Sequence, residues 1–247
     1  MKQIQWTLCL IFLSTFSILP AQTQPEQVGI KTRLVFLGMK GQIREVGLWK
    51  NGKFAALRIP SSNFPEAIEY EGPNPLNLVT LVKNEAGEMI PVSVARATLP
   101  PDAEEVLLLM LPMPPKSAPA TTSNDPSDAS APNPIQPPTR YGIKVVDFSP
   151  SAFPDSSFLL WNLTGRPLLG SVGDKVFKVT PHQFELIQPE INGKPKALDA
   201  KIMYADDTSR QSYTSRKWFL QPNQKFMMIM TANPEDPQQY LLKTVRY

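Results

Sequence analysis

The residues of this chain that could perform chemistry are few, and they lie apart in the sequence. His182 is the single histidine, which excludes a multi-histidine metal site and leaves one imidazole as a possible general base. It stands in the predicted turn Thr180-Pro181-His182-Gln183, and no serine occupies a Gly-x-Ser-x-Gly elbow. We therefore expect an exposed loop histidine and no serine hydrolase triad.

Carboxylates form the strongest cluster of potentially reactive groups. Asp206 and Asp207 are adjacent, with Asp199 upstream, and paired carboxylates can bind Ca²⁺ or perform acid–base chemistry on glycosides. The segment lacks the alternating acidic ligands and the glycine of a calcium loop, so we expect a solvated turn. The alternative is an acidic-residue hydrolase, which requires the three carboxylates to converge in a cleft. Apart from this alternative, the sequence predicts no catalytic residue, no metal site and no cofactor.

Tryptophans could bind sugars, because flat aromatic rings can stack on the apolar faces of sugar rings. The candidates for such a glycan-binding platform are Trp49, Trp161 and Trp218. In a β-sandwich, however, a tryptophan on a central strand is more often a core residue. We expect Trp49, in a short predicted hairpin, to be the most exposed of the three.

The first residues have the pattern of an export signal. Lys2 precedes an apolar run from Trp6 to Leu19, and the polar segment after Ala21 fits cleavage there. This predicts a signal peptide over residues 1–21 and a secreted or periplasmic protein. Cys9, the single cysteine, lies inside the signal, so the mature chain is expected to contain no disulfide. The apolar run is shorter than the roughly 20 residues of a spanning helix, and we expect no membrane span.

The charge balance argues against a nucleic-acid partner. The formal net charge is +3, and the basic residues are scattered along the chain. A nucleic-acid-binding domain concentrates lysine and arginine on one face or along one stripe. We therefore expect neither nucleic acid nor an anionic membrane surface as a partner. Nothing in the sequence indicates the oligomeric state.

A segment rich in proline, alanine and serine divides the chain. Residues 112–139 contain one large aliphatic residue, Ile135, and such a segment buries too little apolar surface to offset its ordering entropy. We expect it to be a disordered linker. It separates an N-terminal β-domain, residues 27–111, from a C-terminal β-sandwich domain, residues 140–247.

Short apolar runs broken by turn signals predict an all-β fold with little helix. The clearest hairpin is Arg44–Ile59, where Asn51-Gly52 fits a type I′ turn that sets Trp49 opposite Phe54. The run Val106–Leu111 is apolar at every position, which is typical of a central strand covered on both faces. Strands recurring about every 8 to 12 residues between turn signals predict two immunoglobulin-like β-sandwich domains.

Two features of the C-terminal half have competing interpretations. Met227, Met228 and Met230 could form a soft-metal site or an adaptable peptide groove, but their strand is apolar on both faces, and we expect core packing. Pro189 and Pro195 flank the turn Asn192-Gly193, which predicts a hairpin at the edge of a sheet.

The strands on either side of the proline-rich segment leave the domain organisation open. Val106–Leu111 and Tyr141–Phe148 could pair with each other as a hairpin with a lengthened loop, because loop-closure entropy grows slowly with length. Residues 112–139 would then be an insertion in one composite antiparallel β-unit instead of a tether between two domains. In that case, cleavage inside the segment would leave the two fragments associated.

Three stretches resemble a group of uncharacterised exported bacterial β-sandwich proteins with no known activity. The stretches are Val106–Pro112, the segment Tyr141–Ser149 followed by Phe153-Pro154, and Trp161-Asn162-Leu163-Thr164 with Pro167-Leu168 beyond. The resemblance implies a bacterial source and the β-sandwich class, and it implies no catalytic residue.

From export, the all-β pattern and the absence of a catalytic constellation, we expect a non-catalytic binding or structural module of the cell envelope or extracellular space. Its partner would be an envelope protein or a glycan. A carbohydrate-binding accessory protein is the first alternative, and an acidic-residue hydrolase is the second.

Overall fold

The computed structural model describes residues 29–113, 138–205, 214–236 and 239–247, which contain sixteen β-strands and no helix. The all-β expectation is confirmed for these residues. In chain order the strands are β1 (Gly29–Gly38), β2 (Gly47–Lys50), β3 (Lys53–Ala56), β4 (Ile68–Pro73), β5 (Leu76–Lys83), β6 (Met89–Ala97), β7 (Glu105–Pro112), β8 (Tyr141–Asp147), β9 (Ser157–Leu163), β10 (Leu168–Val172), β11 (Lys175–Val179), β12 (Phe184–Ile187), β13 (Lys196–Tyr204), β14 (Thr214–Leu220), β15 (Lys225–Ala232) and β16 (Tyr240–Arg246).

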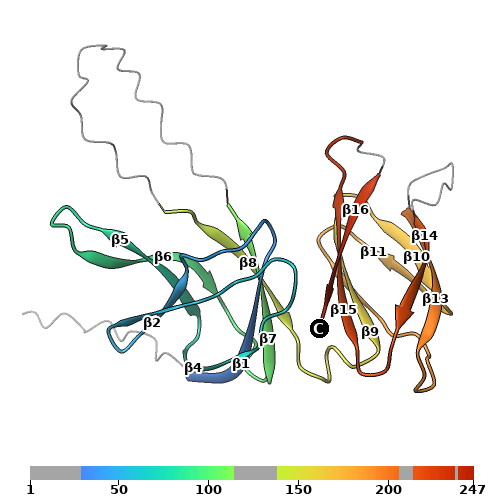
Figure 1. The fold of residues 1–247 in the computed structure, drawn as a ribbon, viewed down its shortest axis with the longest axis horizontal. Coiled ribbons are helices and arrows are strands. Elements are labelled where there is room, and N and C mark those ends of the chain that lie inside the picture. The colour runs from blue at the N-terminus through green and yellow to red at the C-terminus, as the bar shows by residue number, and fades with distance from the viewer. Residues whose placement is uncertain (1–28, 114–137, 206–213, 237–238) are drawn as a thin grey trace, which may run out of the picture.

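The strands form four sheets, which Figure 1 shows as two pairs. The N-inner sheet has the order β4-β1-β7-β8 and the N-outer sheet the order β3-β2-β5-β6. The C-inner sheet has the order β12-β9-β15-β16 and the C-outer sheet the order β11-β10-β13-β14. Adding eight to each N-terminal strand number reproduces the C-terminal orders. The chain is therefore a tandem of two eight-stranded sandwiches with one topology.

The pairing directions repeat as well. The central pairs β1/β7 and β9/β15 are parallel, whereas the other pairs of both sandwiches are antiparallel. The immunoglobulin-like part of the expectation is not confirmed, because that fold is built from antiparallel sheets with strand groups ABED and CFG. The coarser expectation of paired β-sheets around apolar cores holds.

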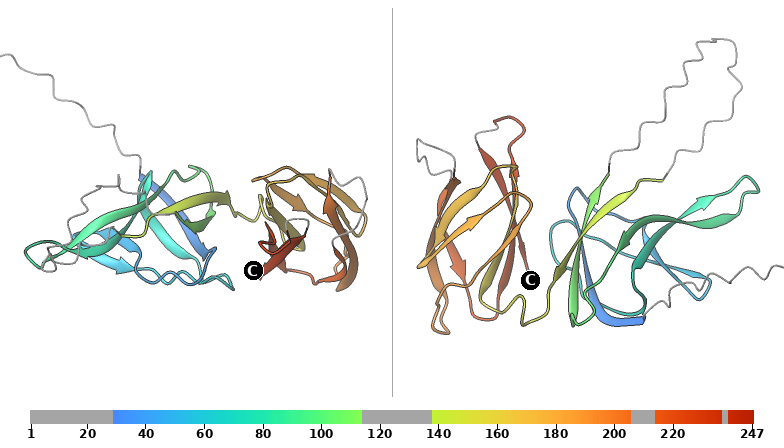
Figure 2. Two further views of the ribbon diagram at one scale, coloured as in Figure 1. Left: turned by 90° about the horizontal axis from the view of Figure 1, so that it is seen from above. Right: turned by 180° about the vertical axis from the view of Figure 1, so that it is seen from behind.

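Three apolar cores lie between four successive sheets. One core joins the N-outer and N-inner sheets, and a second joins the C-inner and C-outer sheets. The third core lies between the two inner sheets, so that the sandwiches pack against each other (Figures 1 and 2). We call this third core the joint. The inner sheets are covered on both faces, which explains why their central strands are apolar at consecutive positions.

Alternation along the central strands assigns each side chain to a core. On β7, Leu108 faces the N-terminal core while Leu107 and Leu109 face the joint. On β15, Met228 faces the C-terminal core and Met227 faces the joint. Because successive side chains of a strand point to opposite faces, one apolar run serves two cores. The three methionines considered as a soft-metal site are buried core residues, since Met230 also lies in the C-terminal core.

The final strand of each sandwich carries a repeated sequence. Tyr-x-x-Lys-x-Val-x-aromatic occurs at residues 141–148 and again at 240–247. The pairings place the two copies in the same register, since Val106 lies opposite Asp147 and Phe226 lies opposite Arg246. The equivalent residues are Tyr141 and Tyr240, Lys144 and Lys243, Val146 and Val245, and Phe148 and Tyr247.

The strand Tyr141–Asp147 pairs with β7 from Val106 to Pro112, antiparallel. The insertion alternative predicts this pairing, and the division between the two sandwiches therefore falls after β8 rather than within residues 112–139. In the C-terminal sandwich, the equivalent β15/β16 connection spans only residues 233–239.

Two turns show where sequence signals succeed and fail. Asn51 and Gly52 have φ values of 48° and 74°, and Trp49 lies opposite Phe54, so the predicted hairpin is confirmed. Asn192 and Gly193 also have positive φ, but the preceding strand β12 and the following strand β13 belong to different sheets. The predicted hairpin between Pro189 and Pro195 is therefore wrong, and the turn connects the inner sheet to the outer one.

Candidate functional site

The residues considered for catalysis do not converge in the described part of the chain. His182 is exposed, with a φ of 63°, in the turn before β12. Asp199 is exposed on β13 opposite Lys217, while Asp206 and Asp207 lie outside the described residues. Among the residues that the structure describes, no three His, Cys, Asp or Glu side chains are grouped so that they could hold a metal ion.

The tryptophan candidates occupy three different environments. Trp161 is buried in the joint and stacks on Phe184 with ring centroids 5.0 Å apart. Trp218 is buried in the C-terminal core against Phe158. Trp49 remains 42% exposed on β2. Of the three, only Trp49 presents an exposed ring to a ligand in this conformation.

The predicted signal peptide, with Cys9 and the cleavage position Ala21, lies outside the described residues. Within those ranges there is no helix with the length and apolar character needed to cross a membrane.

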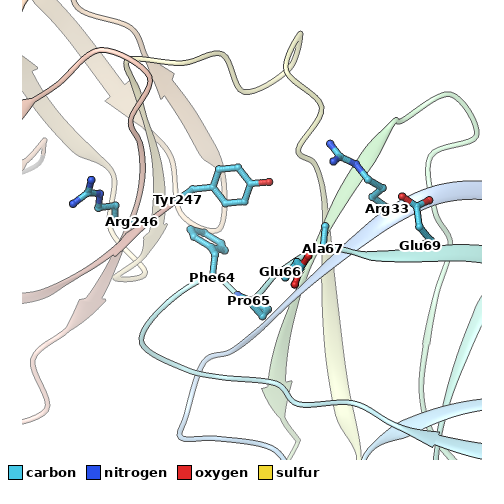
Figure 3. A pocket seen from close by; sticks show the side chains of 8 residues that line it. All are labelled: Arg33, Phe64, Pro65, Glu66, Ala67, Glu69, Arg246 and Tyr247. Atoms are coloured by element: carbon cyan, nitrogen blue, oxygen red, sulfur yellow. The ribbon is translucent and has the colours of Figure 1, made fainter.

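A hollow on the described surface opens where the two sandwiches meet. Its volume is about 630 Å³, and we call it the seam hollow (Figure 3). The N-terminal sandwich contributes Arg33 from β1, Glu69 from the opposite position on β4, and the segment 64–67 between β3 and β4. The C-terminal sandwich contributes Arg246 and Tyr247. The hollow thus depends on both sandwiches.

An aromatic cluster lies beside the seam hollow. Phe148 lies 4.9 Å from Tyr247 and 4.8 Å from Phe153, measured between ring centroids, and Phe64 lies 5.4 Å from Tyr247. The Tyr247 ring meets both Phe64 and Phe148 nearly edge-on, a favoured geometry for aromatic pairs. Since Phe148 and Tyr247 are equivalent residues of the two sandwiches, the repeated sequence meets itself at the joint.

The buried carboxylate of Glu105 connects the two sandwiches next to this cluster. Glu105 begins β7 and is only 2% exposed. Its Oε2 lies 2.6 Å from Nη2 of Arg33, and its Oε1 accepts a hydrogen bond of 2.5 Å from the Tyr247 hydroxyl. The Arg33 side chain is half-exposed, so that it neutralises the carboxylate while keeping contact with water.

Burial and the neighbouring Glu105 control the ionisation of Tyr247. Partial burial is the larger cause, and the hydrogen bond to Glu105 together with its negative charge acts in the same direction, whereas Arg33 acts in the opposite one. Together they raise the pKa of Tyr247 to about 12. The phenol therefore remains a neutral hydrogen-bond donor at physiological pH.

The equivalent position in the C-terminal sandwich carries the opposite charge. Lys225 begins β15, as Glu105 begins β7, and is 7% exposed. Its Nζ lies 3.7 Å from Oδ1 of Asp155 and over the rings of Phe153 and Tyr247, at 5.5 and 5.4 Å from their centroids. Cation–π contacts and the exposed carboxylate thus compensate the buried ammonium group.

The lining of the seam hollow combines charged and aromatic side chains. Arg33, Arg246, Glu66 and Glu69 surround Phe64 and Tyr247. The site went unpredicted from the sequence, although the chain contains two signals of it. One is the repeated sequence ending in Phe148 and Tyr247; the other is the charged residue at the start of each apolar strand, Glu105 and Lys225.

Comparison with protein-family models and with curated proteins gives no match to this chain.

Proposed function

We propose that this protein is an exported, non-catalytic binding module of the cell envelope or extracellular space, and that the seam hollow binds a polypeptide segment of a partner protein. The observation that carries the proposal is the composition of the hollow, in which Arg33, Glu66 and Glu69 of the N-terminal sandwich and Arg246 of the C-terminal sandwich lie around aromatic rings. Small-molecule sites are mostly enclosed and apolar. A lining of arginine, glutamate, phenylalanine and tyrosine suits a peptide that carries charged and apolar side chains.

The test is crosslinking of the tagged protein in the envelope of its native cell, followed by mass spectrometry of the attached species. We expect a reproducible protein partner whose crosslinks fall on the segments that line the seam hollow. Arg246→Glu should reduce its recovery at least tenfold, because this guanidinium group lines the hollow. Arg216→Glu is the matched control, since Arg216 is exposed on β14 away from the hollow. Equal loss with both variants, or recovery of the protein alone, would contradict the proposal.

A carbohydrate-binding accessory protein is the second candidate, and the exposure of Trp49 favours it. Polysaccharide should then quench tryptophan fluorescence in the native protein and fail to do so in Trp49→Ala. A polysaccharide that leaves the native fluorescence unchanged would argue against this function. Screening for glycoside hydrolysis with Asp199→Asn as the comparison would test the acidic-residue hydrolase.

A further inference from the structure

The β5/β6 hairpin extends beyond the N-terminal sandwich. Its ladder continues through the pairs Leu81 with Pro91, Val82 with Ile90 and Lys83 with Met89. Figures 1 and 2 show this hairpin pointing away from the other strands, and we call residues 81–91 the arm. Because the arm continues the ladder of the N-outer sheet, it cannot fold back on its own chain without losing those backbone hydrogen bonds.

The arm is apolar and exposed. Met89 is 52% and Ile90 is 41% exposed, and the facing residues Leu81 and Val82 are partly exposed. Val82 and Ile90 share one face of the hairpin, while Leu81 shares the other face with Met89, so both faces carry apolar side chains. Contiguous exposed apolar surface of this kind marks an interaction site.

The tip of the arm is acidic. Glu85 is exposed, and Glu88 is exposed while its Oε2 accepts a hydrogen bond of 3.1 Å from Nδ2 of Asn84, which closes the turn. Residues 83–89 contain one basic residue, Lys83, and two acidic residues, Glu85 and Glu88, so the tip carries a net negative charge. An anionic lipid surface would repel this tip, which favours a polypeptide partner with basic residues.

The same chain carries a complementary hollow at the base of the β2/β3 hairpin. It has a volume of about 390 Å³, and we call it the β2/β3 hollow. Ala56 and Leu57 provide its apolar part, Arg44 and Arg58 its charge, and no carboxylate lines it. Arg44 donates to Oε1 of Gln42 from Nε at 3.2 Å and from Nη2 at 3.0 Å, and it forms no ion pair with the described residues.

We propose that the arm of one copy of this protein docks in the β2/β3 hollow of a second copy. The apolar side chains of the arm cover Ala56 and Leu57, and Glu85 and Glu88 face Arg44 and Arg58. The arm and the hollow belong to the same chain, so two copies can exchange their arms about a two-fold axis, or successive copies can dock head-to-tail. This inference is independent of the ligand of the seam hollow.

Charge exchange tests the proposal by sedimentation velocity over a range of protein concentrations. The native protein should form dimers or larger species as the concentration rises. The variant Glu85→Lys/Glu88→Lys and the variant Arg44→Glu/Arg58→Glu should each associate at least tenfold more weakly. Mixing the two variants should restore association, because each reversed arm then meets a reversed hollow and each native arm a native hollow.

Two controls separate the contact from general effects of charge and hydrophobicity. Glu71→Lys/Glu190→Lys makes the same charge change at exposed positions outside the arm and should associate like the native protein. Ile90→Ser should weaken association severalfold, whereas Val176→Ser, at an exposed aliphatic residue on β11, should not. A native protein that stays monomeric, or a mixture of the two charge variants that fails to associate, would overturn the proposal.

Discussion

The N-terminal and C-terminal sandwiches bring the same strands to the joint but fill equivalent positions with different side chains. The parallel registers pair Leu37 with Leu109 in one and Trp161 with Ile229 in the other. All four residues are buried in the joint. The two sandwiches therefore share their strand order and the alternation of their side chains. The side chains that pack together in the joint differ in shape. In this respect the joint resembles the isologous interface of a two-fold dimer whose two halves have diverged within one chain.

The difference is sharpest at the start of β7 and β15. Glu105 and Lys225 occupy the same position and carry opposite charges, yet they do not pair with each other. Glu105 is compensated by Arg33 and Tyr247, and Lys225 by aromatic rings and Asp155. The two sandwiches thus compensate the buried charge at this position in different ways, and both use residues around the joint.

The largest expected loss of stability comes from truncating a large side chain on one side of the joint. Trp161→Ala should lower the free energy of unfolding by about 3–5 kcal/mol, and its equivalent Leu37→Ala by about 2–5 kcal/mol, because each leaves a cavity in a closed core. Urea unfolding measures both. Val176→Ala is the exposed control and should change stability by less than about 0.5 kcal/mol. A small effect for either joint residue would show that the inner sheets do not depend on each other.

A smaller effect should follow from removing the hydroxyl that reaches across the joint. Tyr247→Phe leaves Oε1 of Glu105 without its donor and should destabilise the protein by about 1.5–3 kcal/mol, the range for hydrogen bonds to charged groups. The double variant Tyr247→Phe/Glu105→Leu should recover most of this loss, because both polar partners are then absent. Unfolding of the four proteins forms a double-mutant cycle. If the losses of unfolding free energy from the two single substitutions simply add in the double variant, the Tyr247 hydroxyl and Glu105 are not coupled.

Alkaline pH should weaken the same contact. The pKa of Tyr247 is about 12 in the folded protein and about 10 when unfolded. Since the folded value is raised, the stabilisation is complete below pH 10 and is lost as the pH rises from about 10 to about 12. Burial also raises the pKa of Tyr70 and Tyr141, so both tyrosines contribute to the pH dependence as well. The quantity to measure is therefore the difference in free energy of unfolding between the native protein and Tyr247→Phe. The stability gap between them should narrow over this range, and a constant gap would refute the assignment.

The smallest effects distinguish the equivalent hairpin tips of β2/β3 and β10/β11. Gly52 and Gly173 both have positive φ, of 74° and 59°, where an added Cβ costs about 1–2 kcal/mol. At Gly52 the Cβ would meet nothing within 4 Å, while at Gly173 it would lie 3.0 Å from Cδ2 of Leu198. Gly173→Ala should therefore destabilise more than Gly52→Ala in urea unfolding. The reverse order would show that the β10/β11 tip can relax.

Local patterns in the sequence were sufficient for several of the strands and several turns. Alternation and turn residues predicted the Asn51-Gly52 hairpin, and two-sided apolar runs indicated that β7 and the methionine strand β15 are covered on both faces. The same local patterns misplaced the Asn192-Gly193 turn, because positive φ allows a sharp reversal without specifying which sheet receives the next strand.

The candidate site depends on contacts that local patterns do not specify. Arg33 and Glu105 are opposite each other on the neighbouring strands β1 and β7, which lie far apart in the sequence. Tyr247 reaches Glu105 only because the two inner sheets pack together. The repeated Tyr-x-x-Lys-x-Val-x-aromatic pattern is present in the amino-acid sequence, and by itself it indicates a tandem. It does not specify that Phe148 and Tyr247 touch, because that contact requires the two copies to meet across the joint.

Cleavage between β7 and β8 tests the shared sheet and the joint most directly. A specific protease site placed at residues 124–128 would separate the chain into two fragments, the second of which carries β8 and the whole C-terminal sandwich. We expect the fragments to remain associated in native buffer on size-exclusion chromatography, because β8 pairs with β7 and the joint lies between the inner sheets. Urea should then separate them. Fragments that part without denaturant would contradict both the shared sheet and the joint.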